Sequence, residues 1–177
     1  MPALPSGVRG AVITGWGTAL GPKILTNKDL EQMVETSDEW IVERTGIRQR
    51  HVGGTTVGLS IESGRAALDM SGVDLADIDA LVLATTTPDT QWGTAATVQN
   101  ELGLRCGAFD VNAACSGFVY GLVTAHGMIA MGARKVLLIG TDSLSRIVDW
   151  EDRNTAVLFG DGSGAVVLEA VEGPGQL

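Results

Sequence analysis

Cysteine, histidine and basic side chains are all scarce in this chain of 177 residues. Its two cysteines are Cys106 and Cys115, and its start shows no basic segment followed by an apolar one. We therefore expect free thiols in a cytoplasmic protein rather than a disulfide framework. With 12 Lys and Arg against 21 Asp and Glu, the net charge is -9, which argues against a nucleic-acid-binding protein.

One long uncharged stretch, residues 111–133, could in principle cross a bilayer. Polar residues and glycines interrupt it, among them Asn112, Ser116 and His126. We therefore expect no membrane span. A helix that is apolar all round is also what the centre of a layered protein requires, so we expect a buried helix here.

Short apolar, β-branched runs bounded by Gly, Asp, Thr or Pro predict the strands. They lie at residues 10–15, 80–86, 107–111, 135–140, 156–159 and 165–168. Segments with helical periodicity lie at 27–34, 38–44, 57–71, 93–102 and 116–131. With 45% hydrophobic residues and no linker or repeat, the pattern predicts one α/β domain over residues 1–177.

Two features predict a mixed sheet rather than a purely parallel one. Residues 81–84 and 136–139 are continuously apolar, which is typical of strands that are covered on both faces. The glycine-rich run at 160–164 is too short for a crossover helix, so the last two strands are expected to form an antiparallel hairpin at one edge.

Cys115 is the best candidate for a reactive residue, because it lies directly after a predicted strand and at the start of the apolar helix. Backbone N–H groups at a helix N-terminus lack intrahelical partners and can stabilise a thiolate or a developing oxyanion. Such a thiolate could attack a thioester carbonyl. Most free cysteines are nevertheless small buried hydrophobic residues. Position alone leaves Cys115 open to either role, as a nucleophile or as a packing residue. We expect Cys106 to be a packing residue.

Four co-linear segments resemble the signatures of β-ketoacyl-acyl-carrier-protein synthase III, a thiolase-fold condensing enzyme. They are Thr36–Val42 (TSDEWIV), Arg44–Arg48 (RTGIR), Phe109–Phe118 (FDVNAACSGF) and Phe159–Ala165 (FGDGSGA). The resemblance runs from about residue 11 to 170. It implies a thiolase-like half with a mixed five-stranded sheet covered by helices and a central buried helix after the nucleophile.

In that family an acyl-coenzyme A primer acylates a cysteine, and malonyl-acyl carrier protein then loses carbon dioxide and attacks the acyl-enzyme. The resemblance implies that Cys115 is this nucleophile and that the complete enzyme starts fatty-acid synthesis. It implies no metal or redox cofactor, because coenzyme A is carried by the substrate.

The same resemblance implies a coenzyme A site made of Thr36, Trp40, Arg44 and Arg153. Trp40 and Arg153 would sandwich the adenine, with Thr36 beside it and Arg44 near the phosphates. An indole and a guanidinium can both stack on a purine, and arginine pairs well with phosphate. From the residues alone, Trp40 could equally pack in a core, and the two arginines could be solvated or ion-paired.

Trp92 matches the position where one subunit of the family limits the partner's acyl pocket, which suggests a short primer. A packing tryptophan in a loop is the plain alternative. The resemblance also implies that the complete enzyme is a homodimer, which pairs through the strand before Cys115.

The family's catalytic histidine and asparagine lie in a second half of the fold, which this sequence lacks. His51 is expected at the surface or in a turn, and His126 as a hydrogen-bonded core residue. One face of the fold should then be an uncovered apolar patch.

Three alternatives stay open from the sequence. The chain could belong to a related thiolase-fold enzyme that makes polyketide starters or other secondary metabolites. It could be a noncatalytic dimerisation half, although a cysteine at 115 argues against this. A dinucleotide-binding glycine loop at residues 15–21 fits poorly, because its spacing is one residue too long.

Overall fold

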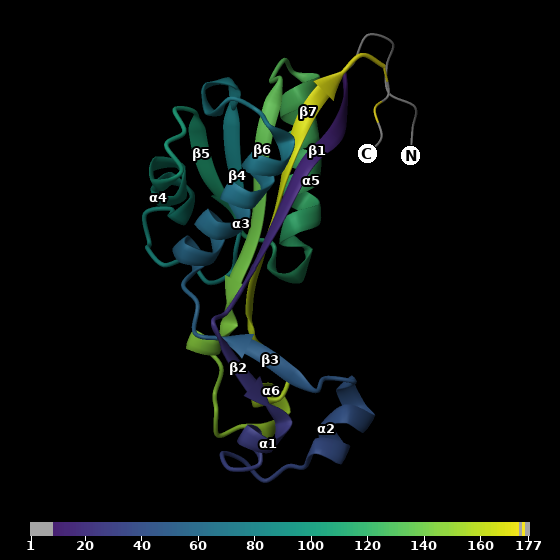
Figure 1. The fold of residues 1–177 in the computed structure, drawn as a ribbon, viewed down its shortest axis with the longest axis vertical. Helices are drawn as coiled ribbons and strands as arrows, with labels where there is room; N and C mark the ends of the chain where they lie inside the picture. Colours follow the sequence, from purple (N-terminus) through teal and green to yellow (C-terminus); the bar gives the residue numbers. More distant parts are fainter. Residues whose placement is uncertain (1–8, 174, 176–177) are drawn as a thin grey trace.

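The computed structural model describes residues 9–173 and 175 (Figure 1). A larger body holds one sheet with its covering helices, and a smaller part with two short strands and short helices lies at one end of the long axis (Figure 1). The chain passes between these two parts several times, so both are built from segments far apart in the sequence.

The larger body contains a five-stranded mixed sheet, which confirms the expected fold class. The strand order is β1-β7-β6-β4-β5. β4 runs parallel to β5 and β6, whereas β7 runs antiparallel to both β6 and β1. The strands are β1 (Gly10–Leu20), β4 (Ala80–Ala84), β5 (Gly107–Val111), β6 (Lys135–Ser143) and β7 (Asp161–Val171).

Helices cover the sheet unequally on its two faces. On one face α3 (Thr56–Ser71) and α4 (Thr94–Glu101) pack on the sheet, and Ala67 and Val98 join Leu81 and Leu137 in one core cluster. On the other face α5 (Gly117–Ala130) packs alone and contributes Ala125 to a second cluster. β4 is buried at all five positions, as its continuous apolar sequence predicted.

The smaller part has its own core and one buried arginine. β2 (Lys23–Thr26) pairs with β3 (Gln49–Val52), and neither strand was predicted. Arg50 donates to Asn27 Oδ1 at 2.9 Å and to Val157 O at 2.7 Å, so its guanidinium joins three distant segments. Its helices are α1 (Asn27–Leu30), α2 (Asp38–Thr45) and α6 (Arg153–Ala156), and the core is Leu30, Ile41 and Val157.

The predicted strand at 156–159 and its edge hairpin are wrong. Asp152 caps α6, so residues 153–156 are helical. The glycine-rich run begins β7 instead of forming a turn, and β7 lies between β1 and β6 rather than at an edge. Three one-turn 3-10 helices complete the described elements: η1 (Leu75–Asp77), η2 (Ala114–Ser116) and η3 (Leu144–Arg146).

The expectation of a buried central helix is only half right, because α5 is buried on one face. Gly121, Ala125 and Ile129 face the sheet, whereas Val119 and Val123 are 61% and 64% exposed. The uncovered apolar face expected for this chain is therefore present along α5. Within the described ranges, the structure contains no helix with the length and apolarity that a membrane crossing needs.

Candidate functional site

Cys115 lies in the single turn of η2, between the end of β5 and the start of α5. The turn is sharp: Ala114 has a φ of 47°, the only positive φ at a non-glycine position in residues 9–173 and 175. Such a conformation costs on the order of 1–3 kcal/mol and is often found at functional sites. The turn leaves the Cys115 side chain exposed.

The Cys115 thiol faces a hollow of about 490 Å³ at the carboxyl ends of β4 and β6 and the start of β7. Five of its lining residues are glycines with no side chain to fill it, and Asp142 is its one charged residue. Its lining is Ala84, Thr85, Ala114, Cys115, Gly117, Phe118, Gly140, Thr141, Asp142, Gly160, Gly162 and Gly164. The hollow can hold a small acyl group beside the sulfur.

Two glycines of α5 bring the helix close to the sheet behind the hollow. A Cβ on Gly121 would lie 2.6 Å from Leu138 Cδ1, and one on Gly117 would lie 3.3 Å from Ala84 Cβ. No larger residue fits at Gly121 without displacing Leu138. The close approach fixes the start of α5, and with it the preceding turn, against the ends of β4 and β6.

A second cluster forms around Trp40 on α2. The Cζ atoms of Arg44 and Arg153 lie 4.6 and 5.0 Å from the centroid of the Trp40 ring. Arg153 also donates to Glu35 O at 3.2 Å, and Thr36 Oγ1 is buried with no hydrogen-bond partner among the described residues. Four side chains singled out from the sequence therefore gather at one place.

Helix caps position this cluster. The Ser37 hydroxyl accepts from Trp40 N at 3.1 Å and so begins α2. Asp152 Oδ1 accepts from Asn154 N at 2.9 Å and begins α6 at Arg153. This backbone hydrogen bond from Asn154 is the main cause that lowers the pKa of the Asp152 carboxyl.

Trp92 is separate from both sites. It lies in the loop between β4 and α4, is 90% exposed, and does not line the Cys115 hollow of its own chain. Its expected role in a partner's pocket therefore stays a prediction.

The remaining cysteine and the two histidines lie outside the hollow. Cys106 packs partly buried against the first core cluster, and burial raises the pKa of its thiol. His51 was wrongly placed at the surface or in a turn: it lies half-buried in β3, with Nδ1 2.9 Å from Gly21 O. His126 was expected to be hydrogen-bonded, yet its buried Nε2 has no partner among the described residues.

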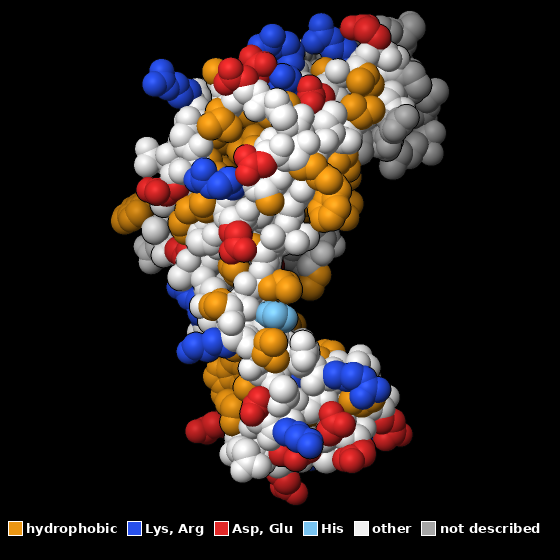
Figure 2. All heavy atoms as spheres, viewed as in Figure 1, with side chains coloured by type: hydrophobic (Ala, Val, Ile, Leu, Met, Phe, Trp, Pro, Cys, Tyr) orange, Lys and Arg blue, Asp and Glu red, His pale blue; other side chains and the backbone are white. Residues whose placement is uncertain are grey.

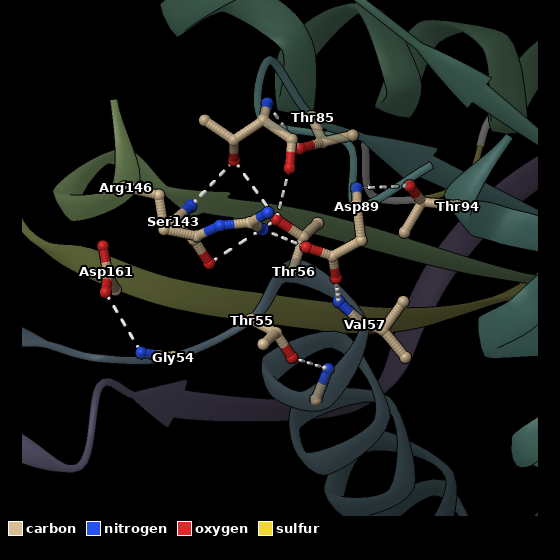
Figure 3. Close-up of polar contacts among 12 residues, drawn as sticks. Gly54, Thr55, Thr56, Val57, Thr85, Asp89, Thr94, Ser143, Arg146 and Asp161 are labelled. Atoms are coloured by element: carbon tan, nitrogen blue, oxygen red, sulfur yellow. Dashed lines mark hydrogen bonds and ion pairs between the residues drawn. The ribbon is translucent and has the colours of Figure 1, made fainter. Parts of the chain in front are cut away.

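Two carboxylates that the sequence did not mark as site residues organise the rim of the hollow. Asp142 Oδ1 accepts from Thr86 N at 2.7 Å and from Thr86 Oγ1 at 2.8 Å. Asp161 is 4% exposed and accepts from Gly53 N and from both Ser145 donors at 2.6–2.8 Å. It also accepts from Gly54 N at 3.1 Å (Figure 3). The sequence signal that could have marked these two carboxylates is an acidic residue at the end of a strand.

The glycine-rich run at 15–21 is no dinucleotide loop, because residues 15–20 lie within β1. Gly15 and Gly17 serve packing instead: a Cβ at Gly17 would lie 2.3 Å from Ser63 O of α3. Across the described ranges, no group of three or more His, Cys, Asp or Glu side chains could hold a metal ion.

Comparison with known proteins gives a consistent result. Residues 109–177 match the family model of 3-oxoacyl-[acyl-carrier-protein (ACP)] synthase III. The β-ketoacyl-[acyl-carrier-protein] synthase III of Rhizobium rhizogenes is 52% identical over 171 residues, which are 93% of this chain and 53% of that protein. The Roseiflexus castenholzii enzyme of the same name is 55% identical over 173 residues, 94% of this chain and 52% of that protein.

Solved structures agree with the sequences. The crystal structure of 3-oxoacyl-[acyl-carrier-protein] synthase III from Aquifex aeolicus superposes with a TM-score of 0.90 at 45% identity, covering 93% of this chain and 55% of that one. A priming β-ketosynthase from the R1128 polyketide pathway gives the same TM-score of 0.90 at 31% identity, covering 98% and 54%.

The chain thus spans about half the length of the curated relatives that it matches. The sequence agrees with those relatives, and the fold with the solved structures, over 93–98% of this chain. The chain is similar in sequence to about one half of the β-ketoacyl-[acyl-carrier-protein] synthase III enzymes named above and shares the thiolase fold of that half.

Proposed function

We propose that this chain carries the nucleophile of a decarboxylating condensing enzyme that joins an acyl-coenzyme A primer to malonyl-acyl carrier protein and so starts fatty-acid synthesis in the cytoplasm. The observation that carries the proposal is the exposed Cys115 thiol at the mouth of a helix, beside a hollow that glycines keep open. The names of the relatives support the same reaction.

The acyl transfer follows from this geometry. The Cys115 thiolate attacks the thioester carbonyl, a new bond forms between Sγ and the acyl carbon, and the bond to the coenzyme A sulfur breaks. Coenzyme A leaves as a thiolate and takes up a proton from solvent. The Ser116 and Gly117 N–H groups at the start of α5 already donate to Ala113 O and Ala114 O, so we propose that the positive end of the α5 helix dipole stabilises the transient oxyanion.

The cluster of side chains around Trp40 supports a binding site for coenzyme A. The indole and two guanidinium groups offer stacking surfaces and positive charge, and the unpartnered Thr36 hydroxyl offers one further polar contact. We propose that adenine stacks between Trp40 and Arg153 and that Arg44 contacts phosphate.

The condensation step needs groups that the described residues do not supply near Cys115. We propose that a second half of the fold provides them, and that the complete enzyme is a homodimer paired along β5. β5 lies at a sheet edge, and its Phe109 is 40% exposed. A mass by light scattering equal to a single complete subunit would count against the dimer.

Intact mass after exposure to a panel of acyl-coenzyme A thioesters tests the acyl transfer. We expect one acyl group on the protein, lost in Cys115→Ala and kept in Cys106→Ala, which removes the other thiol. The chain is measured alone and in a chimera with the part of the R. rhizogenes relative that it does not span. An unmodified protein in both forms would contradict the proposed function.

A further inference from the structure

The loop between β4 and α4 carries Trp92, which is 90% exposed, whereas several hydrogen bonds hold the rest of the loop in place. Asp89 Oδ2 accepts from Val57 N, in the first turn of α3, at 2.6 Å. Asp89 Oδ1 forms an ion pair with Arg146 of η3, and Asp89 N donates to Thr94 Oγ1 at 3.1 Å (Figure 3). One aspartate therefore joins the loop to two neighbouring elements.

The loop is also held on either side of Asp89. Before it, Thr87 O accepts from Thr56 Oγ1 at 2.6 Å, and Thr87 Oγ1 accepts from Ser143 N at 2.8 Å. After it, the carboxylate of Asp110 accepts from Thr94 N and Ala95 N, both at 2.7 Å. Between these anchors, Pro88 and residues 90–92 are exposed.

The Asp89–Arg146 pair is less exposed than an ordinary surface ion pair. The Asp89 side chain is 16% exposed and that of Arg146 is 44% exposed. Loss of the guanidinium would leave a mostly buried carboxylate without its counter-charge, and such an aspartate tends to turn toward water. That turn would also break the bond to Val57 N and free the loop at its centre.

We propose that Asp89 and Arg146 are a specificity-determining positioning pair, which fixes the loop presenting Trp92 and thereby sets the length of acyl primer that the enzyme accepts. The inference rests on the proposed function of the chain and on the pocket-limiting role that the resemblance implies for Trp92. An exposed aromatic side chain limits a pocket sharply only when its loop is preorganised, since a mobile loop yields to a longer acyl chain.

The first test measures the loop itself by hydrogen exchange in the isolated chain. Arg146→Met keeps the length of the side chain and removes the charge, and we expect amide exchange across residues 86–94 to rise about tenfold, the effect of about 1.4 kcal/mol. Arg65→Met is the matched control, because Arg65 is an exposed arginine on α3 with no ion pair within residues 9–173.

The second test measures primer choice by intact mass, with acetyl-, butyryl- and hexanoyl-coenzyme A in competition for Cys115. In Arg146→Met the preference for the shortest primer should fall about tenfold. This is about the discrimination that an apolar pocket achieves between two substrates that differ by one methylene group. Trp92→Ala should give the same relaxed profile, and the double variant should add little to it, because both changes remove one restraint. Arg146→Lys, which retains a positive charge, should restore part of the preference.

Three outcomes would overturn the inference. Unchanged exchange in Arg146→Met would show that the pair does not hold the loop. Faster exchange with an unchanged primer preference would show that the pair is structural only, while Cys115 acylation and the proposed function would stand. Absence of acylation in the parent protein, alone and in the chimera, would contradict the proposed function and remove the specificity role with it.

Discussion

The guanidinium carbon of Arg153 lies 5.0 Å from the centroid of the Trp40 ring, although the two residues are more than 100 positions apart in the sequence. Arg44 approaches the same ring at 4.6 Å from within α2. An indole with two guanidinium groups within 5.0 Å of its centre is well suited to a flat, negatively charged ligand.

The first prediction concerns this cluster. Trp40→Ala and Arg153→Met should each weaken coenzyme A binding by about tenfold, because a stacking or cation–π contact is worth about 1–2 kcal/mol. Isothermal titration calorimetry measures the affinity, and Arg65→Met serves again as the control. Acylation by an acyl-pantetheine, which lacks the nucleotide, should not change; an equal loss for both thioesters would place Trp40 outside the nucleotide site.

The two thiols should differ in their alkylation. Cys115 is exposed, whereas burial raises the pKa of the Cys106 thiol above its usual value of 9.0. Alkylation follows the thiolate form, so Cys106 should react little below pH 9 and faster as the pH rises through and above that value. Peptide mapping after iodoacetamide treatment at pH 7 and pH 10 measures this. Equal labelling of both cysteines at pH 7 would contradict it.

The third prediction concerns Asp161, which joins β7 to the loop before α3 and to η3. Asp161→Ala removes a buried carboxylate that four donors share, and should lower the free energy of unfolding by about 3 kcal/mol. Asp69→Ala, on the exposed side of α3, should change it by less than about 0.5 kcal/mol. Urea titration followed by circular dichroism compares the two variants.

The sequence predicted the sheet best where the apolar pattern is continuous. β4 and β5 end within two residues of their expected limits, and the helix after Cys115 is present. The strand at 156–159 was wrong because the Asp152 cap, which makes 153–156 helical, outweighs four apolar or β-branched residues. The glycines at 160–164 resembled a turn, yet Gly162 and Gly164 lie in β7 and, with Gly160, line the hollow beside Cys115.

From the residues alone, the candidate site was predictable only where one segment carries it. The strand–turn–helix pattern located Cys115, and the resemblance to a known family located Trp40, Arg44 and Arg153. Asp89, Asp142 and Asp161 were missed because their carboxylates accept from partners 16–108 residues away, and no local pattern encodes such contacts.

A fourth prediction tests the close packing of β1 on α3. A Cβ at Gly17 would lie 2.3 Å from a backbone oxygen of α3, so neither strand nor helix can yield easily. Gly17→Ala should lower the free energy of unfolding by about 1–3 kcal/mol. Gly107→Ala, on a strand where no atom lies within 4 Å of the added Cβ, should have little effect. A thermal melt that is equally shifted in both variants would contradict this explanation.

The last prediction concerns the uncovered face of α5. Side chains of Val119, Tyr120 and Val123 are 59–64% exposed there, and a run of exposed apolar side chains favours association in water. The isolated chain should therefore self-associate with rising concentration, and Tyr120→Lys with Val123→Lys should reduce the weight-average mass measured by light scattering. Met70→Lys replaces an apolar side chain of similar exposure, 55%, on the opposite face of the sheet and should leave the mass unchanged. If Met70→Lys reduces the association equally, general surface hydrophobicity causes it and the prediction is wrong. If the association persists in the α5 variant, it takes place elsewhere, and the unpaired edge of β5 near Cys115 is the next surface to test.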